Sequence, residues 1–305
     1  MAYQNISVPR IYCNMADFLL ARGEIGQDDN KLRTLPVDPQ VYGADGDLNG
    51  IEWFPDFGDK KFIALLGNDA LNKLFVYDTE TGDSGGAGIE GDAIINPSGF
   101  KAGFTIHKLN GVPNEVNITD GAKVGSYVLG YYYDFPHSPD LSLSVEYIYD
   151  GHKETTTRGG NTIVNSYYSG PPKWGDLGAW ELGDDAAYTN LHRTGRRRWR
   201  LNFSFMADSS IWGKNLSLSN LSTPQENTSD TSANTLLFSD TFFRVLQFTN
   251  GSQLPFIFQI DNNVASGELA KPDQFAIAKF DSNNFNITQT APNMYSCSLT
   301  IKEIW

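Results

Sequence analysis

The chain has 305 residues and a mass of 33.8 kDa, and its 36 acidic side chains outnumber its 23 lysines and arginines, which gives a formal net charge of -13. A pI near 4.7 argues against general DNA or RNA binding, which needs a net basic surface, and against adhesion to anionic membranes. Aromatic residues make up 13%, and 29 glycines and 14 prolines favour turns, so we expect an all-β protein, mainly an antiparallel sandwich or partial barrel, with one or two short helices.

Residues 1–30 predict an N-terminal arm made of a strand, "ISVPRIY", and a short helix, "MADFLLARG", which Gly23 would end. The first residues contain no basic region followed by an apolar run, so we expect no secretory signal. The sequence contains no run of about 18 apolar residues, so we expect no membrane-spanning helix. We therefore expect the two cysteines, Cys13 and Cys297, to be reduced thiols rather than a disulfide.

Residues 31–194 predict a β-rich domain. Strand patterns include "FIALLG", "FTIHKL", "GSYVLGYYYDF" and "LSLSVEYIYDG", and Asn110-Gly111 between alternating flanks predicts a hairpin. Residues 154–193 are rich in Gly, Tyr and Trp and predict an extended arm.

One stretch of this domain, "DGDLNGIEWFPD", has the spacing of a calcium loop. Asp45, Asp47 and Asn49 would surround a cation, Gly50 would make the sharp turn and Asp56 would supply the twelfth-position carboxylate. However, the twelfth residue is Asp instead of Glu, and no clear helices flank the loop. The competing interpretation is an ordinary turn rich in Asp and Asn.

Residues 195–305 predict a β-sandwich unit with one helix. A strand, "RRWRLNFSFM", comes first, and a long polar surface loop follows at 207–237. A helix is expected near 239–249, with Ser239 or Asp240 as its cap and Asn250-Gly251 at its end. Three or four strands complete the unit.

The arginines of "RRRWRLNFSFM" stand out in an acidic chain. Strand alternation places four apolar side chains on the core face: Trp199, Leu201, Phe203 and Phe205. Arg196, Arg198 and Arg200 then share the opposite face. Three interpretations stay open: a solvated face with local ion pairs, a subunit interface, or nucleic-acid contact. We expect Arg198 and Arg200 to act at a subunit contact, and Arg196 is a further interface candidate.

The sequence shows no converging set of acid, base and nucleophile. Its histidines are scattered without metal-ligand spacing: His107, His137, His152 and His192. "GDSGG" at 82–86 resembles a serine-protease signature, but no matching histidine segment precedes it. We therefore expect no enzymatic activity and no cofactor, apart from the possible calcium ion.

Several segments resemble structural proteins of tailed bacteriophages, especially of marine and cyanobacterial myophage-like virions. They are "VGSYVLGYYYDFPHSPDLSLSVEYIYDG", "PPKWGDLGAWEL", "GRRRWRLNFSFM", "DTFFRVLQFTNGSQLPFIFQID", "PDQFAIAKFD" and "NITQTAPNMYSCSLTIKEIW". The resemblance covers about two-thirds of the chain and is weakest over residues 24–100. It implies a tail or baseplate component similar to tail-tube and distal-tail proteins, whose sandwich is flanked by one helix.

The resemblance also implies that the chain assembles with itself in a ring, for which a hexamer is the expected order, and with other tail or baseplate proteins in the virion. It implies no catalytic residues. DNA would pass near such a ring without sequence-specific contact, and an acidic surface suits that passage. The alternative function is a carbohydrate-binding or receptor-binding β-module, in which Trp174 and Trp180 would stack on sugars instead of packing on a neighbouring subunit.

Overall fold

The computed structural model describes residues 6–21, 40–42, 60–66, 74–77, 93–95, 104–109, 115–118, 122–124, 126–149, 151–166, 195–212, 240–263 and 274–304. Strands dominate these residues, every strand pair is antiparallel, and the helices are short, so the predicted all-β class is confirmed. None of the helices in the described ranges has the length and apolar character needed to cross a bilayer.

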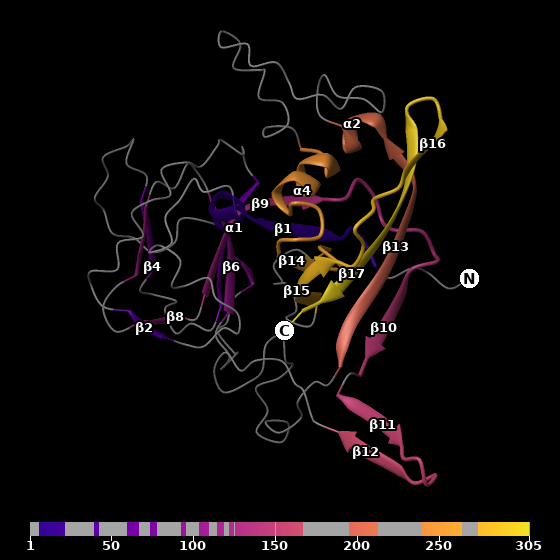
Figure 1. The fold of residues 1–305 in the computed structure, drawn as a ribbon. Helices are drawn as coiled ribbons and strands as arrows, with labels where there is room; N and C mark the ends of the chain where they lie inside the picture. The colour runs from indigo at the N-terminus through magenta and orange to yellow at the C-terminus, as the bar shows by residue number, and fades with distance from the viewer. Residues whose placement is uncertain are drawn as a thin grey trace.

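An 11-stranded sheet forms the body of the protein. Its strands follow in spatial order: β10 (Ser144–Ile148), β13 (Arg196–Ala207), β17 (Met294–Glu303), β15 (Phe275–Phe280), β14 (Phe256–Gln259), β1 (Arg10–Asn14), β9 (Ser126–Asp134), β3 (Lys61–Leu66), β6 (Phe104–Leu109) and β5 (Ala93–Ile95), with β16 (Ile287–Ala291) on β17. The strand direction turns from steep in β13 and β17 to nearly horizontal in β1 and β9 (Figure 1), as expected for a twisted sheet.

This sheet runs across both predicted domain boundaries. Strand β1, from the expected N-terminal arm, lies between β14 and β9, and β10 pairs with β13 across the boundary at 194/195. Hydrophobic alternation predicts that a segment is a strand, but it carries no information on which distant strand completes its backbone hydrogen bonds.

Three two-stranded sheets accompany the body: β2 (Gln40–Tyr42) with β8 (Ala122–Val124), β4 (Leu74–Tyr77) with β7 (Glu115–Ile118), and β11 (His152–Thr156) with β12 (Thr162–Ser166). The predicted hairpin at Asn110-Gly111 is wrong. The strands on its two sides do not pair, because β6 lies between β3 and β5 while β7 pairs with β4. The local turn signal is overridden by longer-range pairing.

The described residues form the helices α1 (Met15–Ala21), α2 (Asp208–Ile211) and α4 (Phe242–Phe248). Helix α4 lies where the sequence predicts it, and Asn250 and Gly251 end it with positive φ angles of 47° and 67°. The predicted cap is wrong, because Thr241 occupies the N-cap position without a side-chain hydrogen bond. Asp240 instead contacts Lys60 and Tyr131 of the sheet.

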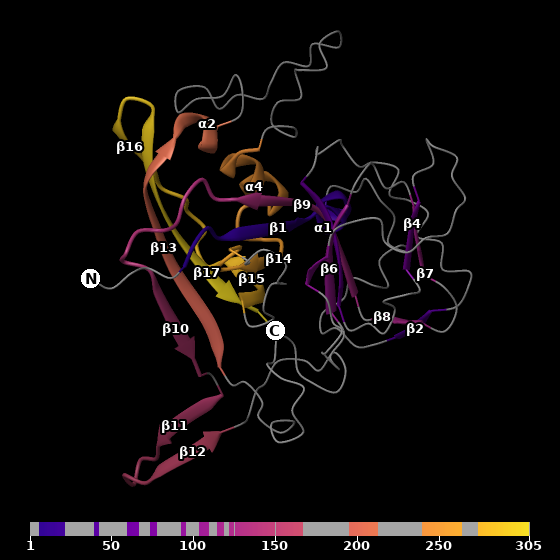
Figure 2. The same ribbon diagram turned by 180° about the vertical axis from the view of Figure 1, so that it is seen from behind.

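Both faces of the central strands are buried. On one face, Phe242, Val245 and Phe248 of α4 pack into the main apolar cluster, which includes Ile11 and Cys13 of β1. Tyr12, between them in sequence, points to the other face and joins a second cluster from β3, β6, β9, β14 and β15. Helices α1 and α4 therefore lie on one side of the sheet (Figure 2).

Strand β13 departs from simple alternation near its end. The pairing of β13 with β17 shifts register between Phe203 and Met206, so Phe205 is 67% exposed and Met206 takes the buried position. The predicted core position of Phe205 is therefore wrong, because the irregularity reverses which side chains face inward. The polar loop predicted from residue 207 also begins later, since Ile211 and Trp212 are buried in the main cluster.

The prediction of free thiols is confirmed for both cysteines. Cys13 and Cys297 are free and buried in the same apolar cluster. Burial raises the pKa of each thiol from 9.0 to about 12, since an apolar environment disfavours the thiolate.

Alkaline pH should therefore destabilise the fold. Each buried thiol contributes to the free energy of unfolding fully below pH 9. This contribution is lost as pH rises toward 12, because the thiol ionises at lower pH in the unfolded chain than in the folded one. We expect a loss of about 1 kcal/mol per thiol between pH 8 and pH 10. Urea unfolding across this range measures the loss. The Cys13→Ser/Cys297→Ser variant should show a smaller fall, and an equal fall would contradict the assignment to the thiols.

Candidate assembly surface

Strand β10 forms one edge of the described sheet and carries exposed apolar side chains. It pairs with β13 on one side only, and Val145 and Tyr147 are each 51% exposed. The large exposed apolar side chains of the described chain lie mostly between residues 141 and 164: Leu141, Val145, Tyr147, Tyr149, Ile163 and Val164, with Phe205 on the neighbouring strand. An open strand edge with several exposed apolar side chains is typical of a protein–protein contact.

The hairpin of β11 and β12 continues from the end of β10 and projects away from the sheet (Figures 1 and 2). Every residue of both strands is exposed. Its turn is closed by a 2.8 Å hydrogen bond from the Thr157 amide to the Asn161 carbonyl oxygen. A two-stranded hairpin is only marginally stable alone in water, so a partner surface would stabilise it.

This hairpin replaces the first part of the arm that was predicted as extended chain over 154–193. The remainder of that arm, with the candidate contact residues Trp174 and Trp180, lies outside the described residues. The same holds for the calcium-loop candidates: Asp45, Asp47, Asn49 and Asp56. Where the structure describes the chain, no group of His, Cys, Asp and Glu side chains is placed to hold a metal ion.

The structure places the predicted arginines on one face of β13, as alternation requires. Arg198 Nη1 lies 3.3 Å from Glu146 Oε2, and Arg198 Nε lies 2.8 Å from Asp281 Oδ2. Arg200 Nη2 lies 3.7 Å from the same Glu146 oxygen, and Arg196 lines a cavity on this face. Local ion pairs within the chain therefore engage Arg198 and Arg200, and their role at a subunit contact stays a prediction.

Arg197 points to the opposite side, which the sequence reasoning did not consider. Its Nε and Nη2 atoms each lie 3.1 Å from a Glu303 carboxylate oxygen, and its backbone N–H donates to Glu303 Oε2 at 3.0 Å. The guanidinium also lies 4.9 Å from the Trp199 ring centroid. Strand alternation could have predicted this position, because Arg197 is two residues before Trp199 and therefore points to the same face of the sheet.

A polar network joins α4 to the sheet. Tyr131 donates a hydrogen bond to Asp240, whose carboxylate also accepts one from Lys60. The Arg244 guanidinium lies 3.9 Å from the Tyr131 ring centroid. Burial lowers the pKa of Arg244 to about 10 and raises the pKa of Tyr131, so the arginine stays charged and the tyrosine stays a donor at neutral pH. These groups are arranged to hold the helix in place.

Comparisons of the chain with protein-family models, with curated proteins and with solved structures gave no match. The described surface itself offers three features that suit binding: the open edge of β10, the exposed hairpin, and the row of cations on the outer face of β13 and β17. The first two are continuous in the chain. The edge of β10 can pair with a backbone strand of another chain, and that contact would bury the exposed apolar side chains of β10 and the hairpin.

Proposed function

We propose that this protein is a structural assembly component of a tailed-phage virion, one that forms a ring in the tail or baseplate. The observation that supports assembly is the exposed apolar edge of β10 with its projecting hairpin. The phage context comes from the sequence resemblance, which covers about two-thirds of the chain.

The orientation of the exposed side chains supports this proposal. Val145 lies directly opposite Trp199, and Tyr147 lies opposite Arg197, so both continue the core face of the sheet beyond the part that the chain itself covers. A neighbouring subunit that covered them would extend the apolar core, and its backbone could hydrogen-bond to the free edge of β10.

A contact between the hairpin of one subunit and a different surface of the next is head-to-tail. Such contacts close into a ring when the rotation per subunit allows it, and a hexamer is the order that the resemblance suggests. Other tail or baseplate proteins would then stack on the ring. An acidic ring would also repel DNA and let it pass without adhesion.

The test is the oligomeric state of Val145→Asp/Tyr147→Asp. Charges at these positions should prevent a neighbour from covering the edge, so light scattering should show loss of the wild-type oligomer, with the melting temperature within about 2 °C because both sites are exposed in the subunit. Thr288→Asp/Thr290→Asp, on the exposed strand β16, is the matched control. A wild-type chain that stays monomeric at high concentration and associates with no other tail protein would contradict the proposal.

A second candidate function is a carbohydrate-binding or receptor-binding module, which the exposed rings of Tyr147 and Tyr149 favour. Aromatic faces of this kind can stack on sugar rings. A glycan array separates the candidates: binding by the monomer that is lost in Tyr147→Ala/Tyr149→Ala would favour this alternative over assembly.

A further inference from the structure

A row of charged residues crosses four strands on the face of the sheet opposite the main core. Glu146 of β10, Arg198 of β13, Lys302 of β17 and Lys279 of β15 are successive cross-strand partners. Three neighbouring cations therefore follow a single carboxylate. Like charges directly opposite each other in a sheet are destabilising, so the Lys302–Lys279 pair lowers the stability of the isolated subunit.

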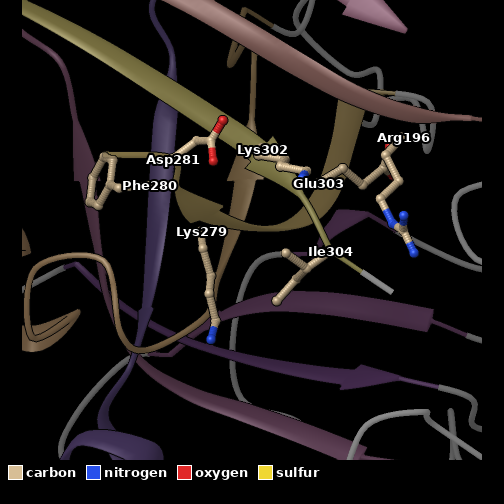
Figure 3. Close-up of a pocket in the computed structure, with 7 residues that line it drawn as sticks. All are labelled: Arg196, Lys279, Phe280, Asp281, Lys302, Glu303 and Ile304. Carbon is tan, nitrogen blue, oxygen red and sulfur yellow. The ribbon is translucent and has the colours of Figure 1, made fainter. Parts of the chain in front are cut away.

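Lys279 and Lys302 line a cavity of about 400 Å³. Figure 3 shows Lys279 and Arg196 on either side of Ile304, with Lys302 above them. The lining residues are Arg196, Lys279, Phe280, Asp281, Lys302, Glu303 and Ile304. Cationic residues from three strands thus line one partly apolar cavity.

The two acidic residues of the cavity are already engaged with arginines of β13. Asp281 pairs with Arg198 at 2.8 Å, and Glu303 pairs with Arg197 at 3.1 Å in the interior. Among the described residues, no ion pair engages Lys279 or Lys302, although their Cα atoms are register partners. An anion placed between these lysines would relieve their mutual repulsion.

We propose that this cavity binds carboxylate side chains of a second copy of this chain, an inference that rests on the proposed assembly function. Acidic side chains number 36 against 23 lysines and arginines, so each copy offers many carboxylates and repels its neighbours as a whole. A local basic cavity offsets that repulsion and fixes the position at which two copies dock. A nucleic acid fits less well, because a phosphate backbone needs an extended basic track on a chain that is not net acidic.

The effect of the lysine pair on the stability of the free subunit distinguishes a binding role from a structural role. If the lysines served the fold, neutralising them would lower the melting temperature. Because they repel each other in the free subunit, Lys279→Gln/Lys302→Gln should instead leave the melting temperature unchanged or raise it slightly. Its self-association should nevertheless weaken.

The experiment is sedimentation velocity of the full chain at 50 and 500 mM NaCl. We expect about tenfold weaker association for Lys279→Gln/Lys302→Gln at low salt, and a smaller salt dependence than wild type shows. The matched control, Lys279→Arg/Lys302→Arg, keeps both charges and should associate like wild type.

Four results would overturn the inference. If wild type assembles and the Gln variant assembles equally with the same salt dependence, the cavity is not at the contact, and the proposed function stands. If wild type stays monomeric throughout, the proposed function fails and the inference with it. A lowered melting temperature in the Gln variant would assign the lysines to the fold. Binding of a duplex DNA oligonucleotide that the Gln variant abolishes would replace the carboxylate partner by a phosphate one.

Discussion

Trp199→Ala is expected to lower the free energy of unfolding by about 3–5 kcal/mol. The indole is 4% exposed and belongs to the main apolar cluster. Its ring centroid lies 5.1 Å from that of Phe258 in an edge-to-face contact, and the Arg197 guanidinium lies over it. Truncation would remove a large buried side chain from the close-packed main cluster, which relaxes only partly around the cavity that is left. Urea unfolding of the purified chain measures the loss.

Phe205→Ala, in the same strand, is the matched control. Phe205 is 67% exposed because of the register shift, so its truncation should change stability by no more than about 0.5 kcal/mol. Simple alternation would instead make the two losses similar. Equal destabilisation by the two substitutions would therefore show that β13 keeps its alternation to the end, in conflict with the observed register.

Alternation predicts this strand well until the irregularity. Trp199, Leu201 and Phe203 are buried as expected. In β17, the alternating residues Tyr295, Cys297, Leu299 and Ile301 of "NMYSCSLTIKEIW" are buried too. The failure at Phe205 has a physical cause, since one extra residue in a strand exchanges its two faces. No local sequence signal marks that residue, because the irregularity is set by how β13 pairs with β17.

The candidate assembly surface was harder to predict than the core. The alternation of Val145, Tyr147 and Tyr149 in "LSLSVEYIYDG" is the same as that of a covered strand, and only the sheet order places β10 at an edge. For the arginines, alternation predicted the shared face of Arg196, Arg198 and Arg200. It could not predict their partners, because Glu146 and Asp281 are brought to β13 by pairing between distant segments.

Breaking the buried ion pair of Arg197 and Glu303 is expected to lower the stability of the fold by a large amount. Glu303→Gln removes, with little change in volume, the negative charge that lies against the buried Arg197 guanidinium. We expect a loss of about 3–5 kcal/mol in the free energy of unfolding, measured by urea titration at pH 7. The Glu303 side chain is 1% exposed, so water cannot replace the lost carboxylate.

Glu146→Gln tests the same chemistry at the surface. Glu146 pairs with both Arg198 and Arg200, but its side chain is 50% exposed, so its loss should cost no more than about 1 kcal/mol. A similar cost for the two substitutions would contradict a special role for burial.

The double variant Arg197→Met/Glu303→Leu distinguishes the net contribution of the ion pair to the free energy of unfolding from the destabilisation caused by removing only one of its charges. The double variant removes the buried arginine charge together with the carboxylate that balances it, so it should recover most of the stability that Glu303→Gln loses. Arg197 also donates to the Phe275 carbonyl oxygen at 2.5 Å, and that acceptor would lose its partner. If the double variant is no more stable than Glu303→Gln, the hydrogen bond from Arg197 to Phe275, more than charge balance, holds β13 and β15 together.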